Sequence, residues 1–465
     1  MTNKPVITRF APSPTGLFHA GSYRTALFAY IFARQNKGKF ILRIEDTDKE
    51  RSKKEYEENI ISSLKWLGLD YDEFYRQSER TEIYKKYLKQ LVDSGHAYIS
   101  KETPKQAGGR IEVIRFKNPN KKVVFEDLIR GKIEFDTTEL KDFVIAKSMD
   151  EPVFHLVNVV DDYEMGMTHI IRGEDHISNT PRQILIYEAI GAPIPLFAHI
   201  PLLLSTDRSK LSKRHGALPV SGYKENGYLP QAIVNYMALL GWHPVDDKEV
   251  LSLSEIMQQF SLERVQKSGA IFDEEKLKWF NHQYIIKLSP ADFIESAKLY
   301  LPEWLATSSQ IFNRILPLLQ EKISSFSEIQ QLFCSGSLSN TDSSKYSKNI
   351  ATSGELQFVH EIQNYPAENL LWKKNPDREV ARKHLKECKK TIENLATEQF
   401  ENGTNELIRS AIWPYAEANG KGDVLWPLRV ALTGQEKSPD PFMSIYILGK
   451  EESLKRIDSA IQLLN

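Results

Sequence analysis

The sequence predicts an α/β doubly wound (Rossmann-like) domain that carries an α+β insertion and is followed by an all-α half. Three observations lead to this fold class. The first 45 residues follow a strand–loop–helix–strand order, which is typical of parallel α/β sheets. Short β-rich pieces separated by polar turns occupy about 97–153, and past Leu229 the chain becomes mainly helical.

The start of the chain sets the expected position of a ligand site. A β-branched, apolar run at 6–10 indicates a strand, which two prolines and a glycine then end. The apolar run 23–33 predicts a buried helix, and 40–44 predicts a second strand. Acidic residues at 45–48 follow that strand, at the edge where open parallel sheets bind their ligands.

Periodicity and turn residues predict the remaining elements. Thr180 is expected to cap a helix with Pro181 at its first position and Gly191 at its end. The other expected helices are 52–68, 80–94 and 231–241. The other expected strands are 111–114, 122–125, 143–146 and 443–448, and the best linker candidate is 334–344.

Composition is that of a globular chain of several domains, with 465 residues, 41% hydrophobic residues and a net charge of −1. This net charge excludes a surface that is basic overall and binds nucleic acid everywhere, but it is compatible with a local basic patch. Only two cysteines occur, which argues against a disulfide framework and a cysteine-based zinc site. The amino terminus has no signal-peptide pattern, and the apolar run 195–204 is too short to span a membrane, so we expect a cytoplasmic protein.

The same patterns divide the chain into five expected parts. They are the first half of the α/β domain (1–96), the insertion (97–153), the second half of the α/β domain (154–225), a helical domain (226–304) and a helical region (305–465), the last with a subdivision near 370.

His19 and Gly21 form the first candidate for chemistry. They lie at the first strand-to-helix turn, where backbone N–H groups and the helix dipole favour a phosphate-bearing ligand. At Gly21 the backbone could approach a nucleotide without a Cβ. A turn with a hydrogen-bonded histidine explains these two residues equally well.

Lys210 and Lys213 form the second candidate, in the segment KLSKR at 210–214. Two lysines three residues apart can both reach a cluster of phosphates. A solvated basic loop is the alternative interpretation.

Together the two motifs resemble the paired signatures of class I aminoacyl-tRNA synthetases, and the wider sequence resembles the bacterial-type glutamyl-tRNA synthetases. The matching segments are RFAPSPTG at 9–16, LRIEDTD at 42–48, NVVDD at 158–162, IRGED at 171–175, GYLPQA at 227–232 and PLRVALTG at 427–434.

The resemblance implies that glutamate attacks the α-phosphate of ATP and that the acyl group then passes to the terminal adenosine of tRNA. It implies catalysis by His19, Lys210 and Lys213 with no protein nucleophile, and Mg²⁺ that arrives with ATP. It also implies a role for each further part of the chain. The insertion would bind the acceptor end of tRNA, 226–304 would contact the stem and 305–465 would bind the anticodon. The implied ATP-binding residues are His19, Gly21, Glu174, Lys210, Ser212 and Lys213. The implied glutamate-binding residues are Arg9, Ala11, Ser13, Glu45, Phe154, Asn158 and Arg172.

Arginine suits the glutamate carboxylate because its planar fork bonds both oxygens. From the sequence alone, a structural ion pair of Arg172 with Glu174 or Asp175 is an equally good explanation of that arginine.

Two positions depart from the family pattern. Phe154 stands where the family often has a tyrosine, and phenylalanine has no hydroxyl to bond the substrate. Residues 97–100 stand where many relatives carry a Cys-x-Cys zinc site; no cysteine precedes Cys334, so we expect no structural zinc.

The expected macromolecular partner is tRNA for glutamate, bound by a monomer; whether tRNA for glutamine is also charged stays open. Phosphate contact and aromatic stacking are the means of RNA binding. A basic run beside Trp372 offers Lys373, Lys374, Arg378, Arg382, Lys383, His384, Lys386, Lys389 and Lys390, although a solvated helix face would look the same. The insertion offers Arg110, Arg115, Lys117, Lys121 and Lys122.

Four other kinds of protein share parts of this pattern. A glutaminyl-tRNA synthetase differs in the segments 11–16 and 45–48, and a glutamyl-transferring tRNA-modifying enzyme would lack the helical region past 305. A non-catalytic RNA-binding module would not need His19, Lys210 and Lys213. Small-molecule nucleotidyltransferases typically have a second histidine where this chain has Ser22.

Overall fold

The computed structural model forms two compact units, Met1–Asn281 and His282–Asn465, which we describe separately. The residues that it describes are 5–102, 112–211, 218–307, 309–333, 354–362, 364–400 and 404–465.

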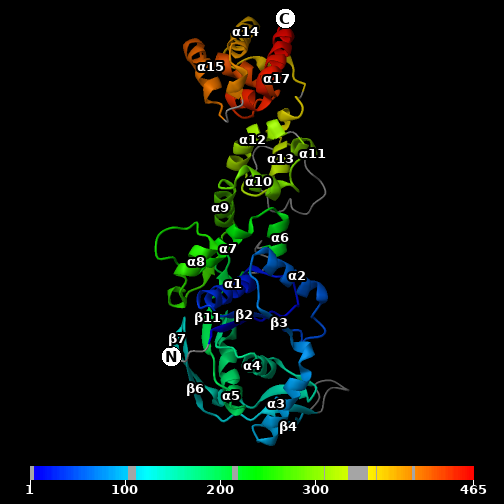
Figure 1. Cartoon of the computed structure of the whole chain (residues 1–465), viewed down its shortest axis with the longest axis vertical. Helices are drawn as coiled ribbons and strands as arrows, with labels where there is room; N and C mark the ends of the chain where they lie inside the picture. Colours follow the sequence, from blue (N-terminus) through cyan, green and yellow to red (C-terminus); the bar gives the residue numbers. More distant parts are fainter. Residues whose placement is uncertain are drawn as a thin grey trace. The chain divides into compact units, whose positions relative to one another are not determined.

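A parallel sheet built in two halves forms the centre of the first unit (Figure 1). In one half, β2 (Lys39–Ile44) pairs with β1 (Ile7–Phe10) and with β3 (Glu73–Arg76). In the other, β10 (His169–Gly173) pairs with β11 (Leu196–Ile200). The backbone N–H of Thr168, directly before β10, donates to the carbonyl of Ile7 at 3.0 Å, so β10 lies beside β1. The two halves meet there, which is the topological switch point at which such sheets bind ligands.

Helices cover both faces of this sheet because its strands alternate apolar side chains between them. Ile171 of β10 belongs to the core with α1 and α2, whereas Ile170 belongs to the core with α4 and α5. The helices of the first unit are α1 (Ala20–Gln35), α2 (Lys54–Trp66), α3 (Thr81–Asp93), α4 (Phe154–Glu164), α5 (Thr180–Ala189), α6 (Val220–Glu225), α7 (Pro230–Leu239) and α8 (Leu253–Gln259). The helices and strands expected at 6–10, 23–33, 40–44, 52–68, 80–94 and 231–241 are therefore confirmed.

The turn between α1 and β2 requires a glycine. A Cβ on Gly38 would lie 2.0 Å from the backbone oxygen of Val6, on the segment that leads into β1. The helix α1 ends at Gln35 with Asn36 as its C-cap, and Gly38 lets the chain that enters β2 pass close to the segment before β1.

The helix α5 begins at Thr180 itself, with Asn179 as its N-cap, so the expected capping role of Thr180 is wrong by one position. The hydroxyl oxygen of Thr180 accepts a bond from Arg172 at 2.7 Å, and its φ and ψ angles are helical. Gly191 closes this helix with φ of 69°, as the sequence predicts.

The insertion is rich in β-strands, as the sequence predicts, and its strands belong to two different sheets. The strands β4 (Ala97–Lys101), β5 (Glu112–Phe116), β8 (Phe143–Ser148) and β9 (Glu151–Pro152) form an antiparallel sheet. The hairpin of β6 (Lys122–Asp127) and β7 (Gly131–Asp136) instead extends the parallel sheet, because Asp127 pairs with Phe197 on β11. Part of the insertion is therefore built into the sheet of the first unit.

The helix α9 (Glu274–Ile285) leads from the first unit into the second, whose described residues are helical and contain no strand. The expected strand at 443–448 is wrong, since these residues lie in the first part of α17, before a kink at Gly449. Asp440 caps this helix through bonds to the N–H groups of residues 442 and 443. The expected linker 334–344 lies outside the described residues. The helices of this unit are α10 (Pro290–Ala297), α11 (Glu303–Thr307), α12 (Ser309–Lys322), α13 (Glu328–Phe333), α14 (Arg378–Glu393), α15 (Glu406–Asn419), α16 (Lys421–Thr433) and α17 (Pro441–Leu463).

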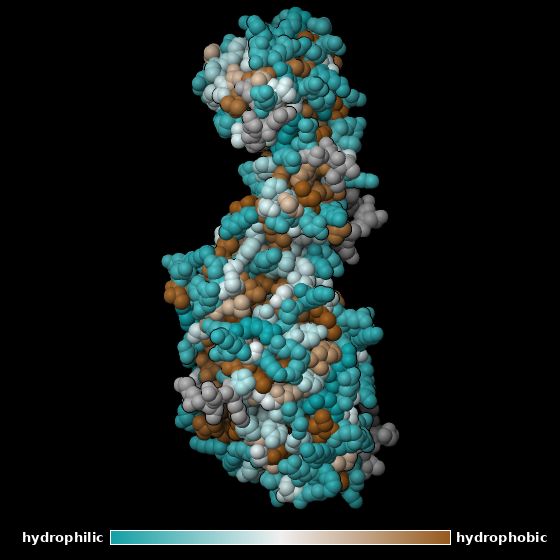
Figure 2. All heavy atoms as spheres, viewed as in Figure 1, coloured by the Kyte–Doolittle hydropathy of each residue, from teal (hydrophilic) through white to brown (hydrophobic). Residues whose placement is uncertain are grey.

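Hydrophilic side chains cover most of the face shown in Figure 2, and apolar ones form separate small patches. Among the described helices, none is both long and apolar enough to cross a membrane.

Candidate active site

A pocket of about 590 Å³ opens where the ends of β1, β2 and β10 meet the start of α1. Both motifs that the sequence singled out contribute to it, although they are far apart in the chain. The expected site residues that line it are Arg9, Ala11, Ser13, His19, Gly21, Glu45, Phe154, Asn158, Arg172 and Lys210. The pocket therefore brings together residues assigned to glutamate and residues assigned to ATP.

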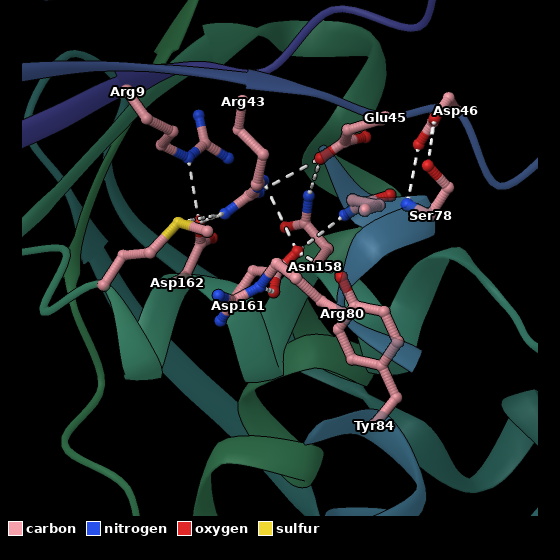
Figure 3. A network of polar contacts seen from close by, with 12 residues as sticks. Arg9, Arg43, Glu45, Asp46, Ser78, Arg80, Tyr84, Asn158, Asp161 and Asp162 are labelled. Carbon is pink, nitrogen blue, oxygen red and sulfur yellow. Dashed lines mark hydrogen bonds and ion pairs between the residues drawn. The ribbon is translucent and has the colours of Figure 1, made fainter. Parts of the chain in front are cut away.

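A buried network of charges forms one wall of this pocket (Figure 3). Arg43 on β2 is fully buried and donates to Asp162 at 2.7 Å and to Glu45 at 3.0 Å. Arg9 donates through Nε to the same oxygen of Asp162 at 3.1 Å. Burial costs much of the hydration of each charge, so each must find a partner inside the network. Asp162 fixes Arg9 through its Nε, and Arg43 fixes Glu45.

Asn158 on α4 is a further hydrogen-bond partner of Glu45. Its Nδ2 donates to Glu45 Oε1 at 2.8 Å, while its Oδ1 accepts from Gln183 on α5 at 3.1 Å. Burial raises the pKa of Glu45, and the charges of Arg43 and Arg9 oppose that rise. A cation placed beside Glu45 would further oppose the rise of its pKa and keep the carboxylate ionised. This carboxylate therefore suits an ammonium group.

Arg172 at the end of β10 is a second buried guanidinium in the pocket, 5% exposed. Its Nε donates to His199 Nε2 at 3.1 Å and its Nη2 to Thr180 at 2.7 Å, and both partners are uncharged at neutral pH. Burial and the nearby charge of Arg9 lower the pKa of Arg172 to about 10. Within the described part of the chain, no carboxylate oxygen lies within 4.0 Å of this guanidinium, so the ion pair with Glu174 or Asp175 is not formed. Arg172 is thus a buried cation whose counter-charge is missing.

The phosphate side of the pocket is the amino terminus of α1. His19 is the N-cap, with an extended backbone, and the first turn carries no acidic residue. A Cβ on Gly21 would meet no atom within 4 Å, so the space beside this turn is open to the pocket. Free N–H groups and the positive helix end are then directed at a ligand.

The other expected ATP-binding residues lie in different surroundings. Lys210 lines the pocket and is exposed, whereas Ser212 and Lys213 fall outside the described residues. Glu174 does not line the pocket: it accepts from the N–H of Leu202 at 2.7 Å and pairs with Arg130 on the β6–β7 turn. Glu174 therefore supports the pocket-lining segment that starts after β11.

Several pocket residues were not singled out by the sequence analysis: Ser22, Arg24, Thr25 and His176. Arg24 is buried and donates to the carbonyls of Leu240 and Pro201. The supporting residues Arg43 and Asp162 lie in segments that carried the family resemblance, but nothing in the sequence indicated their inward direction.

The basic run in the second unit is mostly paired within the chain. The helix α14 begins only at Arg378, so Lys373 and Lys374 precede it. His384 is buried and bonds Tyr415 at 2.8 Å, which removes it from any basic surface. Four of the cations form ion pairs, namely Lys373 with Glu436, Arg378 with Glu368, Arg382 with Glu379 and Lys389 with Asp458. Trp372 packs against Trp426 at a centroid distance of 5.3 Å, so stacking on an RNA base would need this pair to separate.

In the insertion, Arg115 pairs with Glu102 and Lys121 with Glu188. Lys117 and Lys122 are exposed, and Arg110 lies outside the described residues. Lys117 and Lys122 are thus the better placed candidates for contact with an external phosphate.

Comparisons with known proteins give a consistent result. The family model described as "tRNA synthetases class I (E and Q), catalytic domain" matches residues 5–112 and 101–279, and "Anticodon binding domain" matches 292–461. A glutamate–tRNA ligase from Aquifex aeolicus is 40% identical over 99% of both chains, and one from a Sulfurihydrogenibium species is 38% identical over 98% of both. A crystal structure of a glutamate tRNA ligase from Elizabethkingia meningosepticum, in complex with its amino acid, is 33% identical with a TM-score of 0.82, covering 99% of this chain and 100% of that one.

Proposed function

The chain belongs to the class I tRNA synthetases of the glutamate and glutamine group, and from this premise we propose that it ligates glutamate to tRNA. It activates L-glutamate with ATP to glutamyl-adenylate and pyrophosphate. It then transfers the glutamyl group to the 3′-terminal adenosine of tRNA.

The observation that carries this proposal is the uncompensated charge of Arg172. A buried guanidinium is stable only if an anion supplies its counter-charge, and the pocket is the side from which that anion arrives. With Arg9 beside it, Arg172 forms a cationic end for the side-chain carboxylate of glutamate. Glu45 then takes the α-ammonium, together with Ala11 and Ser13 of the same pocket.

This charge pattern favours glutamate over glutamine. An amide in the place of the side-chain carboxylate would leave Arg172 buried without a counter-charge, at a cost of several kcal/mol. Asn158 contributes by holding Glu45 rather than by direct charge, since its Nδ2 is already bonded to that carboxylate.

The chemical step needs no protein nucleophile. The α-carboxylate of glutamate attacks the α-phosphorus of ATP, and pyrophosphate leaves. The amino end of α1 with His19 holds the phosphates, and Lys210 and Lys213 neutralise the charge that grows on the leaving pyrophosphate. Mg²⁺ enters as the ATP complex, held mainly by phosphate oxygens. A hydroxyl of the terminal adenosine then attacks the glutamyl carbonyl and releases AMP.

We also propose how tRNA is read along the chain. The insertion (97–153) binds the acceptor end, 226–304 contacts the stem and 305–465 reads the anticodon, in keeping with the anticodon-binding match over 292–461. We propose a monomer that works in the cytoplasm, where ATP and tRNA meet. We propose no structural zinc, because both cysteines lie far past the insertion; stoichiometric zinc in purified protein would contradict this.

The experiment is aminoacylation of purified tRNA for glutamate and tRNA for glutamine, side by side, with glutamate and ATP. Charging of neither tRNA would refute the proposed function, and charging of both would identify a non-discriminating enzyme. Lys213→Ala should lower the rate of ATP–pyrophosphate exchange, measured with tRNA present, by about a hundredfold, a typical loss for one transition-state contact. An unchanged exchange rate would show that the assigned role of the second motif is wrong.

A further inference from the structure

Three buried polar residues stand in line behind the glutamate pocket. Arg172 on β10 and His199 on β11 are partners in the parallel pairing of these strands, so their side chains meet on one face of the sheet. Asp127 ends β6 on the other side of β11 and bonds His199 Nδ1 at 2.6 Å. Asp127 and His199 do not line the pocket and are 3% and 0% exposed.

The geometry determines where the proton of His199 lies. The Nε of Arg172 always carries a hydrogen, and it points at His199 Nε2 from 3.1 Å. Nε2 must therefore accept, so a neutral ring carries its proton on Nδ1 and donates it to Asp127. Burial lowers the pKa of His199, as does the charge of Arg172, so the ring is neutral at pH 7 although Asp127 opposes this effect.

Asp127 is itself held in place. Its carboxylate accepts from the N–H groups of Ile129 at 3.0 Å, Arg130 at 2.8 Å and His199 at 3.1 Å. Thr180 fixes the other end of the Arg172 guanidinium at Nη2. The guanidinium is thus held by its Nε and by Nη2, and both of these partners are neutral.

We propose that His199 is a positioning residue for glutamate recognition, which orients Arg172 through a neutral acceptor that Asp127 keeps in the Nδ1–H tautomer. The proposal rests on the proposed function. A carboxylate in the place of His199 would orient Arg172 equally well but would also neutralise it. A neutral imidazole fixes the direction of the guanidinium and leaves its charge for the ligand.

Two substitutions at His199 distinguish the bond that it makes with Asp127 from the bond that it accepts from Arg172. In His199→Asn, the amide nitrogen stands near the position of Nδ1 and keeps the bond to Asp127, but His199 no longer provides an acceptor for the Nε of Arg172. In His199→Gln, the amide oxygen stands near the position of Nε2 and can accept from Arg172. We expect His199→Asn to raise the glutamate KM about tenfold while kcat and the ATP KM change less than about threefold, and His199→Gln to restore most of the glutamate KM.

The measurement is aminoacylation by the full chain with saturating ATP and tRNA, after far-UV circular dichroism has shown that each variant is folded. His169→Asn is the matched control, because His169 lies on the neighbouring strand, is partly buried and does not line the pocket. Its glutamate KM should equal that of the wild type. An unchanged glutamate KM in His199→Asn, or a parallel rise of the ATP and glutamate KM values that His199→Gln does not reverse, would overturn the proposal.

A second measurement does not depend on activity or on the folding of a variant. In ¹⁵N-histidine-labelled wild-type protein, the His199 ring should show a protonated Nδ1 and an unprotonated Nε2 at pH 7. A protonated Nε2 would overturn the proposal. Absence of glutamate-dependent charging by the wild type would instead refute the proposed function, and the nitrogen spectrum would still report the tautomer.

Discussion

The two arginines of the pocket differ in how their charge is balanced. Arg9 shares Asp162 with Arg43, whereas the hydrogen-bond partners of Arg172 among the described residues are His199 and Thr180. Arg9 is therefore held as part of the protein's own network, and Arg172 is the cation that a ligand completes. The selectivity of the pocket should depend most on the geometry of Arg172.

Arg172→Lys tests this at the residue scale. Lysine keeps the charge but loses the planar fork and the bond to His199. The glutamate KM should rise about 10- to 100-fold, which corresponds to about 1.4–2.7 kcal/mol, with the ATP KM nearly unchanged. Arg182→Lys on α5 is the control, since Arg182 bonds a backbone carbonyl and does not line the pocket. An equal rise in both variants would contradict the assignment.

Phe154→Tyr restores the hydroxyl that the family often has at this position. Phe154 lines the pocket and packs against His155 and His176 at centroid distances of 5.5 and 5.7 Å. An added hydrogen bond of about 1 kcal/mol should lower the glutamate KM roughly fivefold. If steady-state kinetics show the same KM, then the hydroxyl is not what limits glutamate binding here.

At the scale of elements, α1 has a glycine near each end, and the two serve different purposes. A Cβ on Gly38 would strike the backbone of the segment before β1, whereas a Cβ on Gly21 would project into open space in the pocket. One glycine is needed by the fold and the other by the ligand.

Alanine substitutions should separate these purposes. Gly38→Ala should cost about 3 kcal/mol or more of stability in urea unfolding, because a backbone atom must move. Gly21→Ala should leave stability equal or raise it by up to about 1 kcal/mol, yet raise the ATP KM about tenfold through a clash with bound nucleotide. A destabilised Gly21→Ala, or an unchanged ATP KM, would contradict this division.

Local patterns predicted several elements of the first unit, including β1, α1 and β2, but not the central strands β10 and β11, and the failures have physical causes. The run at 443–448 is rich in residues that favour strands, but its packing against α16 in the second core and the cap at Asp440 make it helical. A strand at 122–125 was expected inside the insertion, but β7 was not, and the place of the β6–β7 hairpin on the edge of the parallel sheet depends on one long-range pairing, which no local pattern encodes.

The family resemblance predicted which residues belong to the site, but it could not predict the contacts between them. The sequence could suggest Arg9, Glu45 and Asn158 as pocket residues, but the network that links them runs through Arg43 and Asp162. The directions of the Arg43 and Asp162 side chains depend on which side of β2 faces α4 and which side of α4 faces β2. That orientation is a property of tertiary packing. The same holds for Arg172: of the two carboxylates that offered an alternative explanation for it, Glu174 bonds Arg130 instead.

At the scale of the whole molecule, two partly buried histidines beside the pocket, His155 and His176, make stability depend on pH. Burial and nearby cations lower the pKa of His155 and of His176 to about 4. Between pH 6.5 and 4 the unfolded chain therefore binds more protons than the folded one, so stability is lost as the pH falls through this range.

His155→Phe should weaken that dependence. From pH 7 to 5 the wild type should lose about 2 kcal/mol of unfolding free energy through this histidine alone, and the variant should not. Urea unfolding at both pH values, followed by tryptophan fluorescence, measures the difference. Equal losses in the two proteins would show that His155 does not carry this effect.

The pairing of Asp127 with Phe197 also has a consequence for synthesis on the ribosome. The β6–β7 hairpin is made long before β11, so the edge of β6 that will join the sheet has no partner until residues 196–200 emerge. At translation rates of about 5–20 residues per second, this interval lasts roughly 4–14 seconds. An open strand edge invites pairing with other chains. The nascent chain therefore carries an unpaired strand edge through this interval, and slower translation across the segment between the two strands would lengthen it.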